Sequence, residues 1–587
     1  MALATIDWVV IIGFLLLIVG VGLSYTNKAG KNIESFFLGG RNLPWWIAGT
    51  SMVATTFAAD TPLLITELVA NDGISGNWLW WNGLIGGILT TFFFAKLWRR
   101  ANIVTDVEFI ELRYAGKPAA FLRGFKSIYL GVFLNSVIIA WVNLALMALI
   151  EVFFDIPKGE QLQYVAIAMI VVALYSSLSG LLGVAITDFI QFIIAMAGCI
   201  VLAVIVVNSE KIGGISGLQE KLPADVFNFF PQLSFFGAAS VAETTTVYTV
   251  GFASFFAFVG MQWWASWYPG ADPGGGGYVA QRIMSAKNEE EATKATLLFQ
   301  IAHHALRPWP WIIVALCAIV LYPELSTDDK KLGYVLAMKE FLPDGLKGLL
   351  LVAFFAAYMS TISTQLNWGT SYLINDFYNR FIEPEADQKR LVLASRIGTV
   401  VIMIIGLAVT SQISTLENAF KFMINCGAGL GMVLILRWYW WRINAWSEIA
   451  ATLAPFIPFS IITYYNATLL DPKEAIVFPY GFFITVAFTT VVWLIVTFVT
   501  SPTETSVLNK FYQKIQPEGA WGVVRSRLGI PKKPSELPSL FLKWFAGIAL
   551  VYAFLFFMGK IIFGDYVNAL YYLAVFGVSA FYLSKKL

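Results

Sequence analysis

Charge is scarce in this chain. Of its 587 residues only 13% are Asp, Glu, Lys or Arg, whereas 58% are hydrophobic. Soluble domains cannot bury that much apolar surface, so a lipid bilayer is expected to solvate most of it. The net charge of +2 gives no basis for expecting an acidic partner such as a nucleic acid. The composition therefore argues against a soluble enzyme and predicts an all-α polytopic membrane protein.

Histidine and cysteine are also rare. The three cysteines lie in apolar runs, so no disulfide framework is expected. The only two histidines, His303 and His304, are neighbours, and neighbours on a helix point about 100° apart, so at most one should face a cavity. The glycine-rich run 274–277 lacks the Lys-Ser/Thr of a nucleotide-binding loop, and no thiol–histidine or metal-binding cluster occurs in the sequence. We therefore expect no enzymatic activity, no cofactor and no ATP drive.

What the chain has instead is a series of long apolar windows, about fifteen of which could cross a bilayer. They fall near 7–25, 44–70, 77–98, 122–152, 162–183, 186–208, 246–269, 293–321, 346–376, 391–412, 415–437, 446–466, 476–500, 541–562 and 566–584. The last two windows are the least distinct, because one long kinked helix and a hairpin have similar hydropathy.

Arginine distribution predicts the orientation. The loops 154–161, 209–245, 322–345 and 467–475 contain no arginine, whereas the loops on the opposite side are rich in it. Since cytoplasmic loops carry the excess of basic residues, we expect the N-terminus outside and the C-terminus in the cytoplasm, which requires an odd number of spans. The polar connector 501–540 is too short for a catalytic domain and is expected to lie on the cytoplasmic surface.

Polar motifs interrupt the apolar pattern. Residues 34–46 read Glu-Ser-Phe-Phe-Leu-Gly-Gly-Arg-Asn-Leu-Pro-Trp-Trp, residues 180–191 read Gly-Leu-Leu-Gly-Val-Ala-Ile-Thr-Asp-Phe-Ile-Gln, and residues 281–287 read Gln-Arg-Ile-Met-Ser-Ala-Lys. In this order they resemble the signature motifs of the sodium/solute symporter family, which includes the sodium/glucose cotransporters. The resemblance covers roughly residues 7–440, and beyond 440 only the hydropathy matches.

The resemblance implies a transporter core of five-plus-five inverted repeats. The repeats would span 44–208 and 246–437, after an extra N-terminal helix and its loop at 1–43 and before additional C-terminal helices at 438–587. In such folds the first helix of each repeat is broken at the bilayer midplane, where ion and substrate bind. The sequence itself predicts both breaks. Alcohols, an acid and a proline enter the apolar run at 54–62, and residues 268–277 contain two Pro and five Gly.

By the same resemblance, two adjacent hydroxyls and three carbonyls would form the main sodium site. The hydroxyls belong to Ser360 and Thr361, and the carbonyls to Ala54, Phe57 and Ala357. About five oxygens suit a hard cation. Hydroxyls on a helix also commonly bond back to the carbonyl four residues earlier, so the hydroxyls alone do not indicate a site.

A second sodium would involve Asp188. An intramembrane carboxylate is by default a hypothesis of function, although a helix cap is the alternative. Ser363 and Thr364 match positions that complete a second site with this acid in two-sodium members of the family. One-sodium members keep the acid as well, so the second ion depends on the two hydroxyls.

The substrate site departs from the sugar carriers. The positions that bind hexose in those relatives are occupied here by Thr61, Trp80, Ala265 and His304. All four residues differ from those of the sugar carriers, so the resemblance does not imply glucose or galactose as the substrate. Tyr268 matches the aromatic inner gate. The other candidate pocket residues are Trp78, Trp81, Trp263, Trp264, Trp267, Asp60, Asn82, Gln262, Arg307 and Asn425. Indole faces flanked by amides and a carboxylate suit a sugar or polyol.

The sequence thus predicts Na⁺-coupled symport of a small polar organic solute, foremost a sugar or polyol, into the cell through the plasma or inner membrane. The transport unit is expected to be a monomer. A symporter of carboxylates or amino acids is the alternative within the class, with Arg307 or His304 binding the anion. Arg307 could instead pair with an acid such as Asp60. From another class, a transporter-fold sensor is disfavoured by the short Lys-Lys tail.

Overall fold

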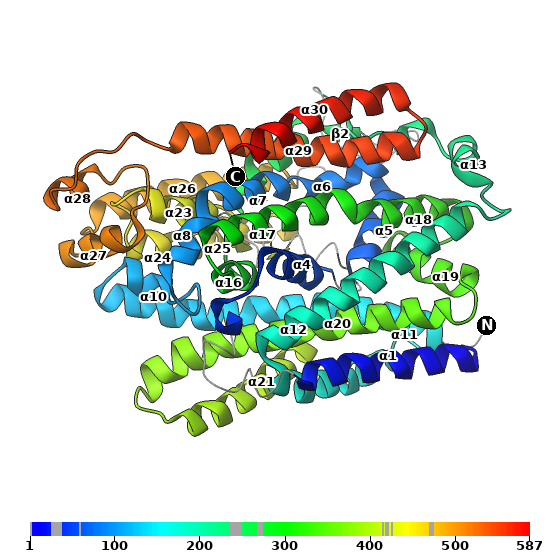
Figure 1. Cartoon of the computed structure of the whole chain (residues 1–587), viewed down its shortest axis with the longest axis horizontal. Coiled ribbons are helices and arrows are strands. Elements are labelled where there is room, and N and C mark those ends of the chain that lie inside the picture. The colour runs from blue at the N-terminus through cyan, green and yellow to red at the C-terminus, as the bar shows by residue number, and fades with distance from the viewer. Residues whose placement is uncertain are drawn as a thin grey trace.

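The computed structural model describes residues 3–24, 38–57, 60–234, 249–266, 274–413, 416, 422–423, 426–468 and 475–586. Within these ranges the protein is almost wholly helical, and the only sheet pairs β1 (Gln232–Ser234) with β2 (Thr249–Gly251) in parallel. Long helices run side by side along the horizontal axis of Figure 1, where the N-terminus lies at one end and the C-terminus toward the other. The predicted all-α polytopic architecture is confirmed.

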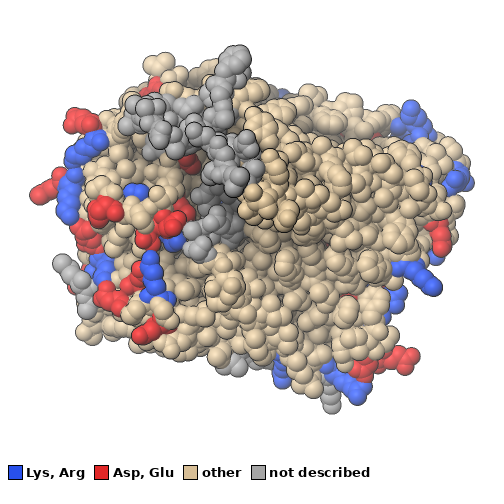
Figure 2. Space-filling model, turned by 180° about the vertical axis from the view of Figure 1, so that it is seen from behind, with Lys and Arg blue, Asp and Glu red and all other residues tan. Residues whose placement is uncertain are grey.

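The helices suit a membrane in length and composition. In the described ranges, ten helices are long and apolar enough to cross a bilayer, and a bent pair raises the number to eleven. Two shorter apolar helices, Thr5–Ile18 and Gln161–Ala173, lie below that length. On the face seen in Figure 2, charged side chains gather at the two ends and leave a broad uncharged belt between them. Fifteen spans remain a prediction.

The helices before β1 form the first group. They are α1 (Thr5–Ser24), α4 (Trp45–Thr55), α5 (Asp60–Asp72), α6 (Trp78–Trp81), α7 (Gly83–Leu89), α8 (Ala95–Ala101), α9 (Phe109–Arg113), α10 (Gly116–Ile128), α11 (Asn135–Phe154), α12 (Gln161–Val207) and α13 (Gly214–Lys221). Two predicted spans, 162–183 and 186–208, fall within the single helix α12. No proline separates them, so nothing in the sequence interrupts the helical hydrogen bonds there.

The helices after β2 continue to the C-terminal pair. They are α14 (Phe252–Phe256), α15 (Trp263–Ala265), α16 (Gly277–Ser285), α17 (Glu289–Ile301), α18 (Pro308–Leu321), α19 (Leu332–Phe341), α20 (Leu346–Ser371), α21 (Gln388–Thr410), α23 (Gly431–Tyr439), α24 (Ala445–Leu453), α25 (Phe456–Thr468), α26 (Tyr480–Val499), α27 (Thr505–Ile515), α28 (Gly522–Arg527), α29 (Leu537–Ile562) and α30 (Tyr566–Ser584). Wider π-helical turns join several of them, at η3 (Thr90–Phe94), η4 (Tyr129–Leu134), η6 (Ala257–Gln262), η7 (Ala302–Leu306) and η9 (Tyr372–Ile382).

Both predicted helix breaks are confirmed. The first lies between α4 and α5, whose axes differ by 58°. The second lies between α15 and α16, where Gly274, Gly275 and Gly277 have φ of +89°, +78° and +54°. A Cβ on Gly275 would also approach Thr90 Cγ2 to 2.9 Å, so glycine is required there for backbone conformation and for space.

The additional C-terminal helices support the core. α29 and α30 are two separate helices that lie side by side (Figure 1), as the hairpin reading of the last windows requires. The Trp544 indole donates a hydrogen bond of 2.9 Å to the Ile85 carbonyl, and the Tyr552 hydroxyl donates one of 2.9 Å to the Trp81 carbonyl. These two bonds attach α29 to α7 and α6, respectively. Residues 501–540 form a connector that contains α27 and α28, and Trp521 anchors it on the carbonyl of Trp438 at 2.8 Å.

Candidate ion and substrate site

Asp188 joins three helices. It lies in the interior of α12 and is fully buried, so it is not a helix cap. The Ser51 hydroxyl of α4 donates a hydrogen bond of 3.1 Å to one carboxylate oxygen, and the Ser360 hydroxyl of α20 donates one to the other. A single buried carboxylate therefore connects the first helix of the core with α12 and α20.

A buried arginine balances this acid. Arg282 on α16 is 1% exposed, and its Nε and Nη2 donate to the hydroxyls of Ser51 at 3.4 Å and Thr55 at 3.2 Å. Its positive charge also acts on Asp188. A buried charge is stable only when it is paired and hydrogen-bonded, and the two hydroxyls complete that pairing. The cluster ties α16, the helix after the second break, to α4.

The five residues predicted to bind the main Na⁺ are all buried around the first break. Ala54 lies in the last turn of α4, Phe57 follows that helix, and Ala357, Ser360 and Thr361 lie on α20, which packs against α4 and α12. The Thr361 hydroxyl oxygen is buried and has no hydrogen-bond partner among the described residues. An oxygen left in this state fits a hard cation, which takes oxygen ligands. Whether these five residues bind Na⁺ stays a prediction.

The hydroxyls predicted for a second ion lie beside a different small cavity. Ser363 and Thr364 line a cavity of about 10 Å³ together with Arg282, Gln281 and Leu181. Such a volume holds about one water-sized particle. Because the guanidinium of Arg282 faces the same space, a second cation would have to bind next to a positive charge. The second Na⁺ also remains a prediction.

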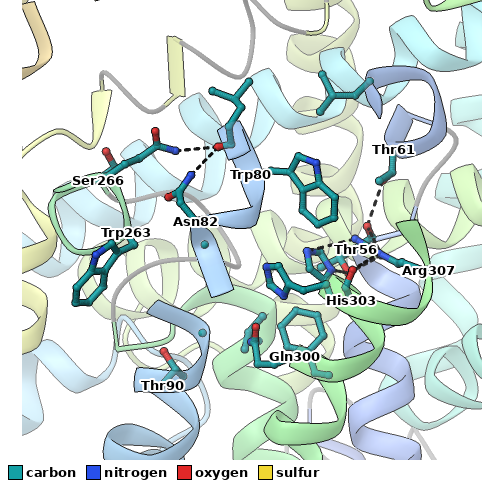
Figure 3. Close-up of a pocket in the computed structure, with 18 of the residues that line it drawn as sticks. Thr56, Thr61, Trp80, Asn82, Thr90, Trp263, Ser266, Gln300, His303 and Arg307 are labelled. Atoms are coloured by element: carbon teal, nitrogen blue, oxygen red, sulfur yellow. Dashed lines mark hydrogen bonds between the residues drawn. The ribbon is translucent and has the colours of Figure 1, made fainter. Parts of the chain in front are cut away.

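A larger cavity of about 160 Å³ lies between the two breaks (Figure 3). The predicted residues that line it are Asp60, Thr61, Trp80, Asn82, Gln262, Trp263, His304 and Arg307. Trp264 does not line it, whereas the neighbouring Trp263 does. Trp78 and Trp81 pack against Phe556 of α29, away from the cavity lining. Tyr268, Trp267 and Asn425 lie outside the described residues.

Amide and indole groups give this cavity its character. Asn82 donates to the Trp78 carbonyl at 2.9 Å. Asn82 and Gln262 both donate to the Leu79 carbonyl, at 2.8 Å and 3.2 Å, where two dashed lines meet in Figure 3. These bonds hold the two amides at the cavity wall. The Trp80 ring stacks on His304 with centroids 5.7 Å apart. The lining therefore combines flat aromatic surface with oriented polar groups.

Both histidines line the cavity, so the expectation that at most one would face it is wrong. They lie in the π-helical turn η7, with ring centroids 4.5 Å apart. A π turn contains more residues than an α turn, so adjacent side chains diverge less. His303 Nδ1 lies 3.0 Å from the hydroxyl of Thr56 at the first break.

Arg307 has a use that the sequence did not suggest. Its Nη1 donates to the carbonyls of Val53 at 3.2 Å and Thr56 at 2.9 Å, at the carboxyl end of α4. A cation is favourable there because the last carbonyls of a helix carry partial negative charge. The guanidinium thus caps the broken helix.

Sequence reasoning also missed several polar groups of the cavity. Gln300, Ser266, Thr90 and His303 all line it. Gln300 Oε1 and Ser266 Oγ are buried without a hydrogen-bond partner among the described residues. The one available signal for Gln300 was an uncharged amide inside an apolar window, which does not reveal the face on which it lies.

Comparisons with known proteins agree with this geometry. The model of the Sodium:solute symporter family matches residues 36–454. The chain is similar to the sodium/glucose cotransporter of Vibrio parahaemolyticus, with 25% identity over 78% of this chain and 85% of that protein. It is 24% identical to sodium/glucose cotransporter 1 of Oryctolagus cuniculus over 75% of this chain and 69% of that protein, and 21% identical to sodium/myo-inositol cotransporter 2 of the same organism over 80% and 72%.

A solved structure shares the fold. A Na⁺-coupled sialic acid symporter, determined in a substrate-bound outward-open state, superposes with a TM-score of 0.63 at 18% identity, over 85% of this chain and 99% of that one. The relatives are transporters rather than enzymes. The family model covers most of the chain, from within the first motif through the other two and the residues around both helix breaks, so the protein belongs to the sodium:solute symporter family.

Proposed function

We propose that the protein couples inward movement of Na⁺ to uptake of a small neutral polyhydroxylated solute, a sugar or a polyol, across the cell membrane. Alternating access between the two sides would expose the cavity of about 160 Å³ in turn. Na⁺ would bind at Ala54, Phe57, Ala357, Ser360 and Thr361. A membrane voltage of 100 mV supplies about 2.3 kcal/mol per Na⁺, enough to concentrate a neutral solute about fifty-fold.

The observation that carries the substrate class is the state of the polar groups in the cavity. Gln300 Oε1 and Ser266 Oγ are buried and unpartnered among the described residues, so hydroxyl groups of a solute would satisfy them. The Trp80 and Trp263 indoles offer apolar faces for the carbon skeleton. Unpaired neutral donors and acceptors beside aromatic rings favour a sugar or polyol.

The guanidinium of Arg307 bears on the alternative substrate. A symporter of carboxylates or amino acids would use Arg307 or His304 to meet the anion. Arg307 Nη1, however, already donates to two carbonyls at the end of α4. A solute carboxylate would compete with these bonds, so this chemistry is the second candidate. The names of the similar proteins, which include glucose and myo-inositol carriers, also favour neutral solutes.

The segment after the second break supplies an inner gate. The Trp98 indole donates to the Gly274 carbonyl at 2.6 Å, and the amide N–H of Gly277 donates to Asp106 at 2.9 Å. Gly275 between them lines the cavity. We infer that releasing these two bonds opens the cavity toward the cytoplasm, with Tyr268 as the predicted aromatic part of the gate. From the arginine distribution we further propose that the N-terminus lies outside and the C-terminus in the cytoplasm. We also propose that the transport unit is a monomer.

The test is a ligand screen followed by transport. Purified protein is screened by thermal shift against sugars, polyols, nucleosides and carboxylates, with and without Na⁺, and any stabilising compound is then tested for Na⁺-dependent uptake into proteoliposomes. We expect a neutral polyhydroxylated hit whose uptake carries positive charge. Gln300→Leu should weaken its binding by about two- to tenfold, while Gln412→Leu, on a residue exposed beyond α21, should not. A carboxylate as the only transported hit would replace this proposal.

A further inference from the structure

We propose that Arg307 positions the backbone of the Na⁺ site and thereby couples that site to the substrate cavity. This inference rests on the proposed function, because it concerns the carbonyls of Ala54 and Phe57 as Na⁺ ligands. It assigns Arg307 a role in ion affinity, beside its charge interaction with Asp60 and in place of binding a substrate carboxylate.

The hydrogen bonds of Arg307 lie one residue before each proposed carbonyl ligand. Its Nη1 bonds the carbonyl of Val53 at 3.2 Å and that of Thr56 at 2.9 Å. Each carbonyl belongs to the planar peptide unit that leads into the next residue, Ala54 or Phe57. Holding these two planes restricts the directions in which the carbonyls of Ala54 and Phe57 can point. The capping arginine would therefore bond the carbonyls of Val53 and Thr56, and the ion those of Ala54 and Phe57, at the same carboxyl end of α4.

A stack of aromatic rings also connects Arg307 to Phe57. The guanidinium of Arg307 lies over the Trp311 ring at 5.5 Å, and Trp311 stacks on Phe57 with centroids 5.3 Å apart and planes 11° from parallel. Phe57 in turn meets Phe354 of α20 edge-on at 6.1 Å. Phe354 is on the helix that carries the Ser360 and Thr361 hydroxyls. Arg307 thus contacts the segment around Phe57 in two ways. Its guanidinium donates to main-chain carbonyls there, and it lies over a ring that stacks on Phe57.

The other side of Arg307 faces the substrate cavity. Arg307 and His303 both line it, and Arg307 Nη2 lies 3.3 Å from His303 Nε2. Both also contact the Thr56 hydroxyl, Arg307 at 3.1 Å and His303 at 3.0 Å. A solute that displaces either side chain changes the bonds that hold the end of α4, and Na⁺ at that end restricts the same side chains. Affinity coupling of this kind is reciprocal between the two sites.

The geometry requires arginine rather than lysine. A guanidinium presents several N–H donors in one plane and can bond two carbonyls, a hydroxyl and a ring face at once. An ammonium group is a compact point charge on a flexible stem, so Arg307→Lys keeps the charge and loses the fork. This variant therefore separates positioning from electrostatics.

The experiment titrates Na⁺ onto the purified full-length protein without solute, at constant ionic strength, and follows thermal stabilisation. Arg307→Lys is expected to raise the half-saturating Na⁺ concentration by about tenfold and to change the ratio of Li⁺ to Na⁺ affinity, because the carbonyl geometry is altered. Arg113→Lys is the matched control. Arg113 is equally buried and donates to the carbonyls of Arg437 at 2.8 Å and Ile443 at 3.1 Å beyond α23, so it should lower stability without moving the Na⁺ titration.

A milder pair of variants protects against misfolding. Thr56→Val removes the hydroxyl that Arg307 and His303 share and should shift the Na⁺ titration in the same direction, whereas Thr56→Ser should restore it. An unchanged Na⁺ titration for Arg307→Lys, together with weaker solute binding, would overturn the inference and make Arg307 a substrate residue only. A wild-type protein that shows no Na⁺ response at all would instead overturn the proposed function.

Discussion

Thr361→Val separates ion binding from folding. The Thr361 hydroxyl is buried and has no hydrogen-bond partner among the described residues, whereas the neighbouring Ser360 hydroxyl donates to Asp188. Valine has nearly the shape of threonine, so this substitution removes the oxygen and little else. Ser360→Ala, in contrast, removes a hydrogen bond from a buried carboxylate as well as an expected ion ligand.

The magnitudes follow from these two environments. A buried hydroxyl without a partner costs about 1–3 kcal/mol of desolvation, so Thr361→Val should leave folding stability unchanged or raise it by about 1 kcal/mol. An interaction between a polar group and a full charge contributes about 1.5–3 kcal/mol, so the Na⁺ half-saturation should rise at least about tenfold. Ser360→Ala should weaken Na⁺ binding similarly and also lower stability, because Asp188 loses a donor.

The assay pairs thermal unfolding without Na⁺ with Na⁺-dependent uptake in proteoliposomes. Thr489→Val is the matched control, since the Thr489 hydroxyl on α26 is likewise buried and unpartnered among the described residues but lies on a helix outside the proposed site. It should have the same effect on stability and none on Na⁺ dependence. Loss of stability in Thr361→Val with an unchanged Na⁺ half-saturation would refute the assignment of this hydroxyl to the ion.

Three further predictions concern charge and gating. If a second Na⁺ binds, Asp188→Asn should lower the charge coupled per solute by about one in reversal-potential measurements; a wild-type ratio of one Na⁺ per solute would exclude the second site. Glu448→Gln should lower the unfolding temperature sharply, because Glu448 bonds the buried Lys126 and Arg437, and breaking such a pair costs about 3–5 kcal/mol; a change within the scatter of surface variants would contradict this. Gly275→Ala should slow transport while solute still binds, since a side chain there would meet Thr90, and an unchanged uptake rate would exclude the gate.

The features best predicted from the sequence were the long helices and the helix breaks. The apolar windows predict most of the long helices because length and composition alone permit a span. Both helix breaks were predictable, since proline and glycine act locally on the backbone. The continuous helix α12 was not, because hydropathy dips at Gly180 and Gly183 resemble a turn while no proline forces one.

Side-chain environments were harder to predict. Asp60, Thr61, Trp80 and Asn82 were correctly expected near the cavity because they follow the first break closely in the chain. Gln300 and His303 were missed. His303 lies 247 residues after Thr56 of the first break, in the π-helical turn η7, and Gln300 lies at the end of α17 just before that turn. Hydrophobic periodicity does not predict such a turn, and it changes which residues share a face.

The opposite charges of Asp188 and Arg282 also bear on how charge crosses the membrane. Asp188 and Arg282 already balance each other through the Ser51 hydroxyl. The five proposed Na⁺ ligands, at Ala54, Phe57, Ala357, Ser360 and Thr361, are themselves neutral, so an ion bound there adds a full positive charge to the transporter. A neutral solute adds none. The loaded transporter therefore carries one net charge per Na⁺ through the membrane field, and uptake should accelerate as the inside becomes more negative.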